Sequence, residues 1–243
     1  MPPIRKGDGT PVTPKGISQI RTGDGRILFD GVAIPDSALT QNADHIWYMD
    51  EGSGSTVADS VGTEDGTISE SVWSSGVGAG DFVVENQNAG DIITIGDGVF
   101  NNETSFTVVA WGFHPSGGDG YLFQQNTTDV LFQIDGSENI TGFVGDESNP
   151  TEVTPDEGWI MGAITYDGST ATIYAYDLDG EIVTSSWSAP EPSWDDVFSF
   201  GNRPDGDRTW IGGIDYGVVV HSEATESDIQ DHYESTVGLY DGS

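Results

Sequence analysis

From residue 43 onward the chain is a succession of short apolar or alternating runs separated by turns. Runs of this length, rich in Val, Ile, Phe, Tyr and Trp, are typical of strands in all-β sandwiches. The pattern predicts strands over residues 46–49, 81–84, 91–95, 106–113, 121–125, 130–134, 140–144, 159–166, 171–176, 181–185, 197–201 and 214–221. Asp-Gly and Gly-Asp-Gly turns separate many of them, so we expect antiparallel hairpins that build a two-sheet sandwich.

One helix is predicted near the end of the chain, from Glu226 to about residue 235. Either Thr225 or Ser227 would cap its N-terminus, and Gln230, three residues beyond Ser227, would complete a capping box. Ile229 and Tyr233 lie four residues apart and would form its buried face. The fold expected from the pattern is therefore all-β with one short C-terminal helix.

The first 42 residues differ from the rest in their charge and their prolines. They hold five of the seven basic residues, which are Arg5, Lys6, Lys15, Arg21 and Arg26. An apolar run at residues 27–29 predicts one short strand among turns. We expect residues 1–42 to form an extended basic arm for assembly, and residues 43–243 to form the sandwich domain. The arm would dock on another subunit of a homo-oligomer or on a different protein of the same assembly.

Motifs at both ends of the predicted sandwich carry a family resemblance. The first strand runs into Asp-Glu-Gly-Ser-Gly at 50–54, Ala-Asp-Ser-Val-Gly at 58–62 and Asp-Gly at 65–66. Gly-Ile-Asp at 213–215 precedes the last apolar strand and the helix, and Ser-Phe-Thr-Val-Val-Ala-Trp occupies 105–111. Over roughly residues 43–236 these motifs resemble the laminin-G-like, concanavalin A-like jelly-roll family. The resemblance implies a jelly-roll sandwich.

The net charge of −34, from 41 acidic and 7 basic residues, would destabilise a compact state by self-repulsion in dilute buffer. At molar salt the Debye length is about 3 Å, so a dense carboxylate shell costs little and keeps the surface hydrated. We interpret the charge as adaptation to brine, and we expect no nucleic-acid partner. No apolar run approaches the 18 residues of a membrane span, so no membrane insertion is expected.

By the same resemblance, calcium is the expected cofactor. The resemblance places its ligands at Asp59 and Asp65 in the first loop and at Asp215 in the Gly-Ile-Asp motif. Carboxylates and loop carbonyls are the ligands that calcium prefers. The family often has an acidic residue after that last Asp, where this chain has Tyr216. An alternative left open is that Asp215 accepts backbone hydrogen bonds and ties the closing strand to the opening strand.

Sugar binding would use aromatic side chains outside the core, because aromatic rings stack on sugar rings. Trp111 and Trp159 lie in apolar strands and are predicted to be core residues. The candidates lie among Ser, Gly, Pro and Asp, and they are Trp73, Trp187, Trp194 and Trp210. For each of them a structural role that anchors a loop is the alternative.

A glycoside hydrolase is the one enzyme class that the pattern raises. Asp177, Asp179 and Glu181 alternate as paired catalytic carboxylates would on one strand face. Gly180 interrupts this spacing, because Asp-Gly between two apolar runs is a strong hairpin signal. We therefore expect these acids on a turn, and we expect no enzymatic activity.

The sequence lacks a recognisable leader, and this absence, the brine-adapted charge and the basic arm together favour one functional hypothesis. The chain would be a surface component of a virion of a halophilic archaeal virus, either a capsid decoration or a tail protein. Its sandwich would bind host surface glycoprotein or glycan. The alternatives are a secreted or cell-surface carbohydrate-binding adhesin of a halophilic archaeon, and a glycoside hydrolase on the same fold.

Overall fold

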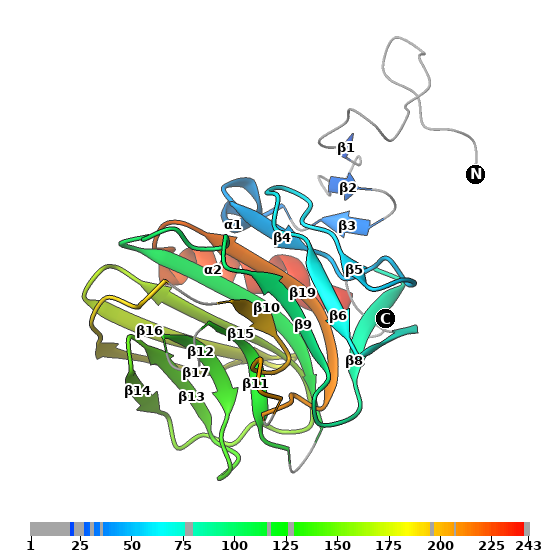
Figure 1. Cartoon of the computed structure of the whole chain (residues 1–243). Helices are drawn as coiled ribbons and strands as arrows, with labels where there is room; N and C mark the ends of the chain where they lie inside the picture. The colour runs from blue at the N-terminus through cyan, green and yellow to red at the C-terminus, as the bar shows by residue number, and fades with distance from the viewer. Residues whose placement is uncertain are drawn as a thin grey trace.

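The structure is a computed structural model that describes residues 36–75, 80–115, 118–125, 129–194, 197–206 and 208–240. It also describes the backbone of three short strands before residue 36, β1 (Ile20–Arg21), β2 (Ile27–Phe29) and β3 (Val32–Ile34), which form a small sheet of their own. The remaining arm residues lie outside the described part of the chain. Two large antiparallel sheets face each other in the domain, and helix α2 lies beside one of them (Figure 1).

The first large sheet has the order β17-β16-β15-β10-β19-β8-β7, and β4 also pairs with β19. In chain order its strands are β4 (His45–Trp47), β7 (Val72–Ser75), β8 (Phe82–Asn86), β10 (Phe106–His114), β15 (Gly158–Tyr166), β16 (Thr170–Asp177), β17 (Gly180–Ser188) and β19 (Gly212–Val220). The closing strand β19 thus lies between β10 and the strands from the start of the domain.

The second large sheet has the order β14-β13-β12-β11-β18-β9-β6-β5. In chain order its strands are β5 (Thr56–Val57), β6 (Gly66–Ser69), β9 (Ile92–Gly96), β11 (Gly120–Gln125), β12 (Val130–Ile134), β13 (Ile140–Val144), β14 (Glu147–Pro150) and β18 (Phe198–Phe200). Within each of the two sheets every pairing of neighbouring strands is antiparallel, which confirms the predicted antiparallel jelly-roll sandwich.

The space between the sheets holds the main core. Its aromatic centre includes Trp47, whose ring lies 5.5 Å from Phe200 and 6.1 Å from Phe198. Phe106 and Phe123 are fully buried in the same cluster. Burying aromatic side chains dominates the energetics of such a core, and each contributes about 2 kcal/mol or more relative to exposure.

A second core lies on the other face of the first sheet, under α2 (Glu226–Thr236) and the short 3-10 helix η1 (Val237–Leu239). Ile229 and Tyr233 point from α2 onto this face, as their spacing predicts, and Tyr233 stacks on Tyr176 with ring centroids 4.7 Å apart. The helix begins at the N-cap Thr225, and its capping-box partner is Asp228. The predicted alternative cap, Ser227 with Gln230, is wrong.

All twelve strands that the apolar runs predicted are present, two with the predicted bounds and the others with bounds shifted by one to three residues. The runs missed β5, β6, β7 and β14. These strands lie at or near sheet edges and carry Gly, Ser, Thr or Glu, so one or both of their faces are exposed. Within the described residues no helix has the length and apolar character needed to cross a bilayer.

A four-residue helix, α1 (Ala38–Gln41), precedes the first strand and packs against α2. Its N-cap Ser37 closes a capping box with Thr40. The Oγ atom of Ser37 lies 2.8 Å from Nδ1 of His232 on α2, at hydrogen-bond distance. Leu39 is buried in the outer core. The predicted boundary between arm and domain at residue 42 therefore falls inside the folded domain, because α1 is part of it.

His232 makes the outer core sensitive to acid. Its side chain is fully buried, stacks on Tyr216 at 5.7 Å, and burial lowers its pKa to about 3. In the unfolded chain the pKa is about 6.5, so between these values the unfolded state binds a proton that the folded state does not. Stability contributed by the neutral imidazole is thus lost as pH falls below about 6.5, by slightly more than 1 kcal/mol per pH unit at most.

We expect the free energy of unfolding, measured with urea from pH 7 down to pH 5, to show this loss. His232→Gln is expected to reduce the slope of that free energy against pH by the equivalent of up to one proton, whatever its effect on stability at pH 7. Ile229→Val is the matched control, because it perturbs a buried residue of the same helix without removing a group that binds a proton, so its slope should stay that of the wild type. An unchanged slope in the His232 variant would contradict the assignment.

A candidate ligand-binding pocket

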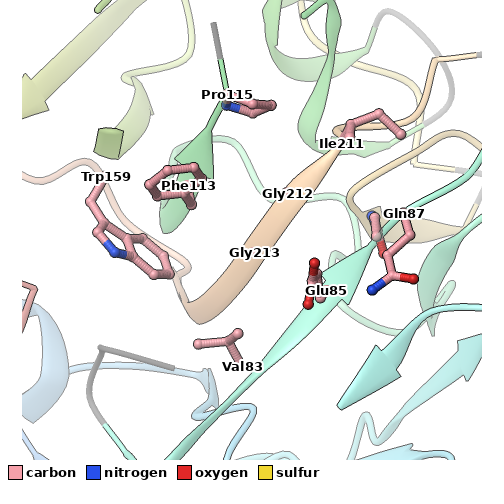
Figure 2. A pocket seen from close by; sticks show the side chains of 10 residues that line it. Val83, Glu85, Gln87, Phe113, Pro115, Trp159, Ile211, Gly212 and Gly213 are labelled. Carbon is pink, nitrogen blue, oxygen red and sulfur yellow. The ribbon is translucent and has the colours of Figure 1, made fainter. Parts of the chain in front are cut away.

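A pocket of about 500 Å³ opens where the first sheet meets the loop before β19. It lies on the sheet face that carries the outer core, since Val83 and Trp159 belong to that core. Residues of β8, β10, β15 and β19, and of the chain next to their ends, line it: Val83, Glu85, Asn86, Gln87, Phe113, Pro115, Trp159, Ile211, Gly212 and Gly213. Figure 2 shows the aromatic rings on one side and the polar side chains on the other.

Two glycines at the start of β19 make the floor hollow. Gly212 has φ +137°, and a Cβ there would clash with the carbonyl oxygen of Phe113, so no other residue fits without strain. A Cβ on Gly213 would instead lie 3.4 Å from Trp159, 3.5 Å from Val83 and 3.7 Å from Phe113. These are ordinary contact distances, so Gly213 leaves open a space that a methyl group would fill.

Trp159 forms the aromatic wall and is held in place from behind. Its ring meets Phe113 edge to face at 5.8 Å and packs at 4.9 Å against Tyr240, which follows η1. Tyr240 stacks on Trp111 at 4.2 Å, and its hydroxyl donates a 2.8 Å hydrogen bond to Asp215. The wall is therefore preorganised by the C-terminal segment that covers this sheet.

Glu85 and Gln87 form the opposite wall. They alternate along β8 and its continuation, so both project to the same side as Val83. Glu85 pairs with Gly213 across the ladder, and its half-buried carboxylate has no hydrogen-bond or ion-pair partner among the described residues. The backbone N–H of Gln87 donates to Asp91 at 2.6 Å, which fixes the turn that follows. The pocket thus has an aromatic wall on one side and, on the other, the Glu85 carboxylate as a hydrogen-bond acceptor and the Gln87 side-chain amide as both donor and acceptor.

The predicted calcium ligands are not brought together. Asp59 and Asp65 are neighbours, since the backbone N–H of Asp59 donates to Asp65 at 2.9 Å. Asp215 is fully buried on the outer-core side of β19, where a β-bulge between Ile214 and Tyr216 leaves it as the extra residue. Within the described ranges no three His, Asp or Glu side chains are grouped to hold a metal ion. A calcium site shared by all three stays a prediction that the described geometry does not support, because the bulge turns Asp215 toward Tyr240.

Asp59 acts as the tie between the opening strand and its loop. Its Oδ2 accepts hydrogen bonds from Nδ1 of His45 at 2.6 Å and from the Glu64 N–H at 3.0 Å. Its Oδ1 accepts from the N–H groups of Ile46, Val61 and Gly62 at 3.2, 3.2 and 2.9 Å. Burial alone would raise the pKa of Asp59, but His45 and the backbone donors outweigh it and lower the pKa.

Chelation tests whether calcium nevertheless contributes. We expect excess EDTA to leave the melting temperature unchanged, because both oxygens of Asp59 already accept hydrogen bonds and Asp215 faces Tyr240. A melting temperature that falls with EDTA and recovers with added calcium would restore the calcium hypothesis.

The four predicted sugar-binding tryptophans do not form one site. Trp194 and Trp210 are core residues at 8% and 2% exposure and neither lines the pocket, so the structure gives no support to their prediction as ligand-binding residues. Trp194 packs 4.9 Å from Phe100, and the indole N–H of Trp210 donates to the Phe113 carbonyl at 2.9 Å. Both are buried by segments far away in sequence.

Trp73 and Trp187 are partly buried and lie on opposite edge strands of the first sheet, β7 and β17. Each anchors a neighbouring segment through its indole N–H, Trp73 to the carbonyl of Gly54 at 2.9 Å and Trp187 to that of Glu147 at 3.2 Å. Their separation excludes a shared binding surface.

The carboxylates considered for hydrolysis lie on a hairpin turn. Asp177 ends β16, and its Oδ1 accepts the backbone N–H groups of Asp179 and Gly180 at 2.8 and 3.0 Å. Glu181 is exposed at the start of β17 and accepts a 3.4 Å hydrogen bond from Tyr176. The turn geometry therefore agrees with the hairpin that the Asp-Gly pair predicts.

Sequence reasoning missed the pocket because its walls come from separate strands. Trp159 is a core residue at 9% exposure, as its apolar neighbours predict, and it also lines the pocket. A signal was present in the Gly212-Gly213 pair, since two glycines at a strand start indicate a bulge or a close approach.

Comparisons with known proteins agree with this architecture. No curated protein matches the sequence. A mutant of Trypanosoma rangeli sialidase displaying trans-sialidase activity superposes with a TM-score of 0.62 at 14% identity, over 85% of this chain and 35% of that chain. This chain thus spans about a third of the sialidase chain that it matches.

Domain 4 of AbnA, a GH43 extracellular arabinanase from Geobacillus stearothermophilus, was solved in complex with arabinotriose. It superposes with a TM-score of 0.58 at 15% identity, over 79% of this chain and 98% of that domain. At such identities the likeness shows the fold alone. Residues 86–230, more than half of the chain, match the laminin-G-type family model described as "Concanavalin A-like lectin/glucanases superfamily". The protein therefore belongs to the concanavalin A-like lectin/glucanase superfamily.

Proposed function

We propose that the protein is a non-enzymatic carbohydrate-binding domain that attaches to a glycan or glycoprotein surface in brine. The pocket between Trp159 and Glu85 carries this proposal. A planar indole held from behind suits the apolar face of a sugar ring, and carboxylate and amide groups suit its hydroxyls. The sugar-bound AbnA domain supports the proposal as far as a shared fold can, since nearly all of that domain is covered.

The absence of catalysis is part of the proposal. Retaining and inverting glycosidases use two carboxyl groups that flank the bond to be cleaved, about 5–10 Å apart. Glu85 is the one carboxylate among the residues that line the pocket, and Asp177 and Glu181 lie on the β16–β17 hairpin. We expect no cleavage of any glycan that binds. Release of reducing ends that Glu85→Gln abolishes would establish a hydrolase instead.

For the biological setting we propose a surface protein of a halophilic archaeal virus that attaches to its host. The acidic composition supports a protein that works in brine, and the basic residues before residue 36 would meet the acidic surface of a neighbouring copy. Several copies in one assembly would turn weak single sites into firm attachment. A cell-surface adhesin of a halophilic archaeon fits the same pocket, and immunogold labelling of purified particles and of cells separates the two.

A glycan array at molar salt tests the proposed binding, with Gly213→Ala as the variant that fills the pocket floor. The added methyl group contacts Trp159, Val83 and Phe113 without a clash, and Gly213 has no positive φ, so the fold is expected to tolerate it. We expect glycan affinity to fall by about fivefold or more, because the methyl group occupies space that the ring needs.

Gly136→Ala is the matched control, because a Cβ there meets only Asp119 at 3.8 Å, on a turn that does not line the pocket. It is expected to bind as the wild type does. An array on which the wild-type protein binds no glycan, or on which Gly213→Ala binds as well as Gly136→Ala, would refute sugar binding in this pocket.

A further inference from the structure

The charge of the pocket points to one class of sugar. The proposal here rests on the proposed function and concerns which ring the pocket accepts. Glu85 is the charged side chain among the lining residues, and it is half-buried without a partner among the described residues. A half-buried carboxylate that no protein group satisfies loses hydration and gains nothing in return until a ligand supplies a donor.

A cation is the donor that compensates such a carboxylate best. Charge-assisted hydrogen bonds are about twice as strong as neutral ones, and an ammonium group also gains from a nearby aromatic face. Trp159 and Phe113 stand across the Gly212–Gly213 floor from Glu85, so a ring lying on the indole would present its substituents to the carboxylate (Figure 2).

The same arrangement works against acidic sugars. Proteins bind the carboxylate of a sialic or uronic acid with Arg or Lys, and neither is among the residues that line the pocket. Among the residues whose side chains the structure describes, the two arginines are engaged elsewhere, Arg208 with Asp119 at 2.9 Å and Arg203 with Asp205.

We infer that the pocket selects a pyranose that carries a protonated amine, binds the neutral sugar more weakly, and excludes sugars with a carboxylate. Glu85 is the specificity-determining residue. The fold likeness to a sialidase therefore does not extend to a preference for sialic acid.

Three methyl glycosides of one hexose test this inference, with the hexose chosen as the ring that binds best on the array. They are the amino sugar, the neutral sugar and the uronic acid, measured by NMR titration at molar salt and at a pH where the amine is protonated. We expect the amino sugar to bind about tenfold more tightly than the neutral sugar, and the uronic acid to show no saturable binding.

Glu85→Gln is the variant that removes the charge and keeps the shape. It is expected to bind the amino and the neutral sugar about equally, and to keep its affinity for the neutral sugar within about threefold. Glu147→Gln changes the net charge equally at an exposed edge strand outside the pocket, and it should preserve the wild-type order.

The outcomes distinguish this inference from the proposed function. Neutral sugar binding that Gly213→Ala weakens, without preference for the amine, would overturn the inference and leave the proposed function standing. A uronic acid that binds as tightly as the amino sugar would also overturn it, as would an amine preference that persists in Glu85→Gln. Binding of none of the three sugars would overturn both.

Discussion

An Asp59→Ala variant is expected to lose about 3 kcal/mol or more of unfolding free energy. The side chain is fully buried and accepts five hydrogen bonds, four from backbone N–H groups and one from His45. Removing it leaves several donors without an acceptor, and each buried unsatisfied group costs about 1–3 kcal/mol. The expected loss of unfolding free energy is smaller than the sum of these costs, because in the variant water can reach the loop and hydrate some of the freed N–H groups.

The control for Asp59 is Asp167→Ala. Asp167 accepts the N–H groups of Ser169 and Thr170 at 2.8 and 2.7 Å, but it is exposed on the β15–β16 turn. Water replaces those bonds, so we expect a loss of about 1 kcal/mol or less. Urea unfolding at molar salt measures both variants. Equal losses for the two would contradict the role assigned to Asp59.

The acid dependence of Asp59 has a defined sign. Its folded pKa lies below the value near 4 of an unfolded Asp, so its contribution is present above that value. It is lost as pH falls through the lowered folded pKa. His232 acts at higher pH, because its window runs from about 6.5 down to about 3.

Transfer from molar to low salt is expected to lower the melting temperature by about 10 °C or more. The 41 acidic residues repel one another across a single domain, and at low salt the Debye length grows to about 30 Å, so the repulsion is no longer screened. A loss of about 3 kcal/mol corresponds to this shift for a domain of this size.

Screening must be separated from a general effect of solutes on hydrophobic burial. A neutral osmolyte matched to the molar salt in water activity strengthens burial without screening charge. We expect it to recover less than half of the lost melting temperature. Equal melting temperatures at low and molar salt would contradict the interpretation of the charge as adaptation to brine.

The fold followed from periodicity, because most of the strands bury at least one face and their apolar residues repeat accordingly. Helix α1 escaped detection since four residues carry no 3.6-residue period, and its stability comes from the Ser37 cap and from packing on α2. Trp194 and Trp210 were misassigned because their sequence neighbours are polar, whereas residues such as Phe100 and Gly112 bury them from elsewhere in the chain.

The candidate site depended on tertiary placement still more. Trp159 and Glu85 lie far apart in sequence, and they face each other only because β8, β19, β10 and β15 are neighbours in one sheet. The bulge at Asp215 also could not be predicted from the local sequence. The Gly-Ile-Asp motif resembles one that supplies a metal ligand, but in the structure the Asp215 carboxylate accepts a hydrogen bond from Tyr240. Register within a sheet is set by many contacts at once, and no local motif specifies it.

A crystal structure of the wild-type protein, soaked at molar salt with the sugar that binds best, tests the central claim most directly. The pocket hypothesis predicts one ring above Gly213, with its apolar face on the indole of Trp159 and its polar substituents toward Glu85 and Gln87. A sugar ordered at another surface of the domain while this pocket stays empty would contradict it.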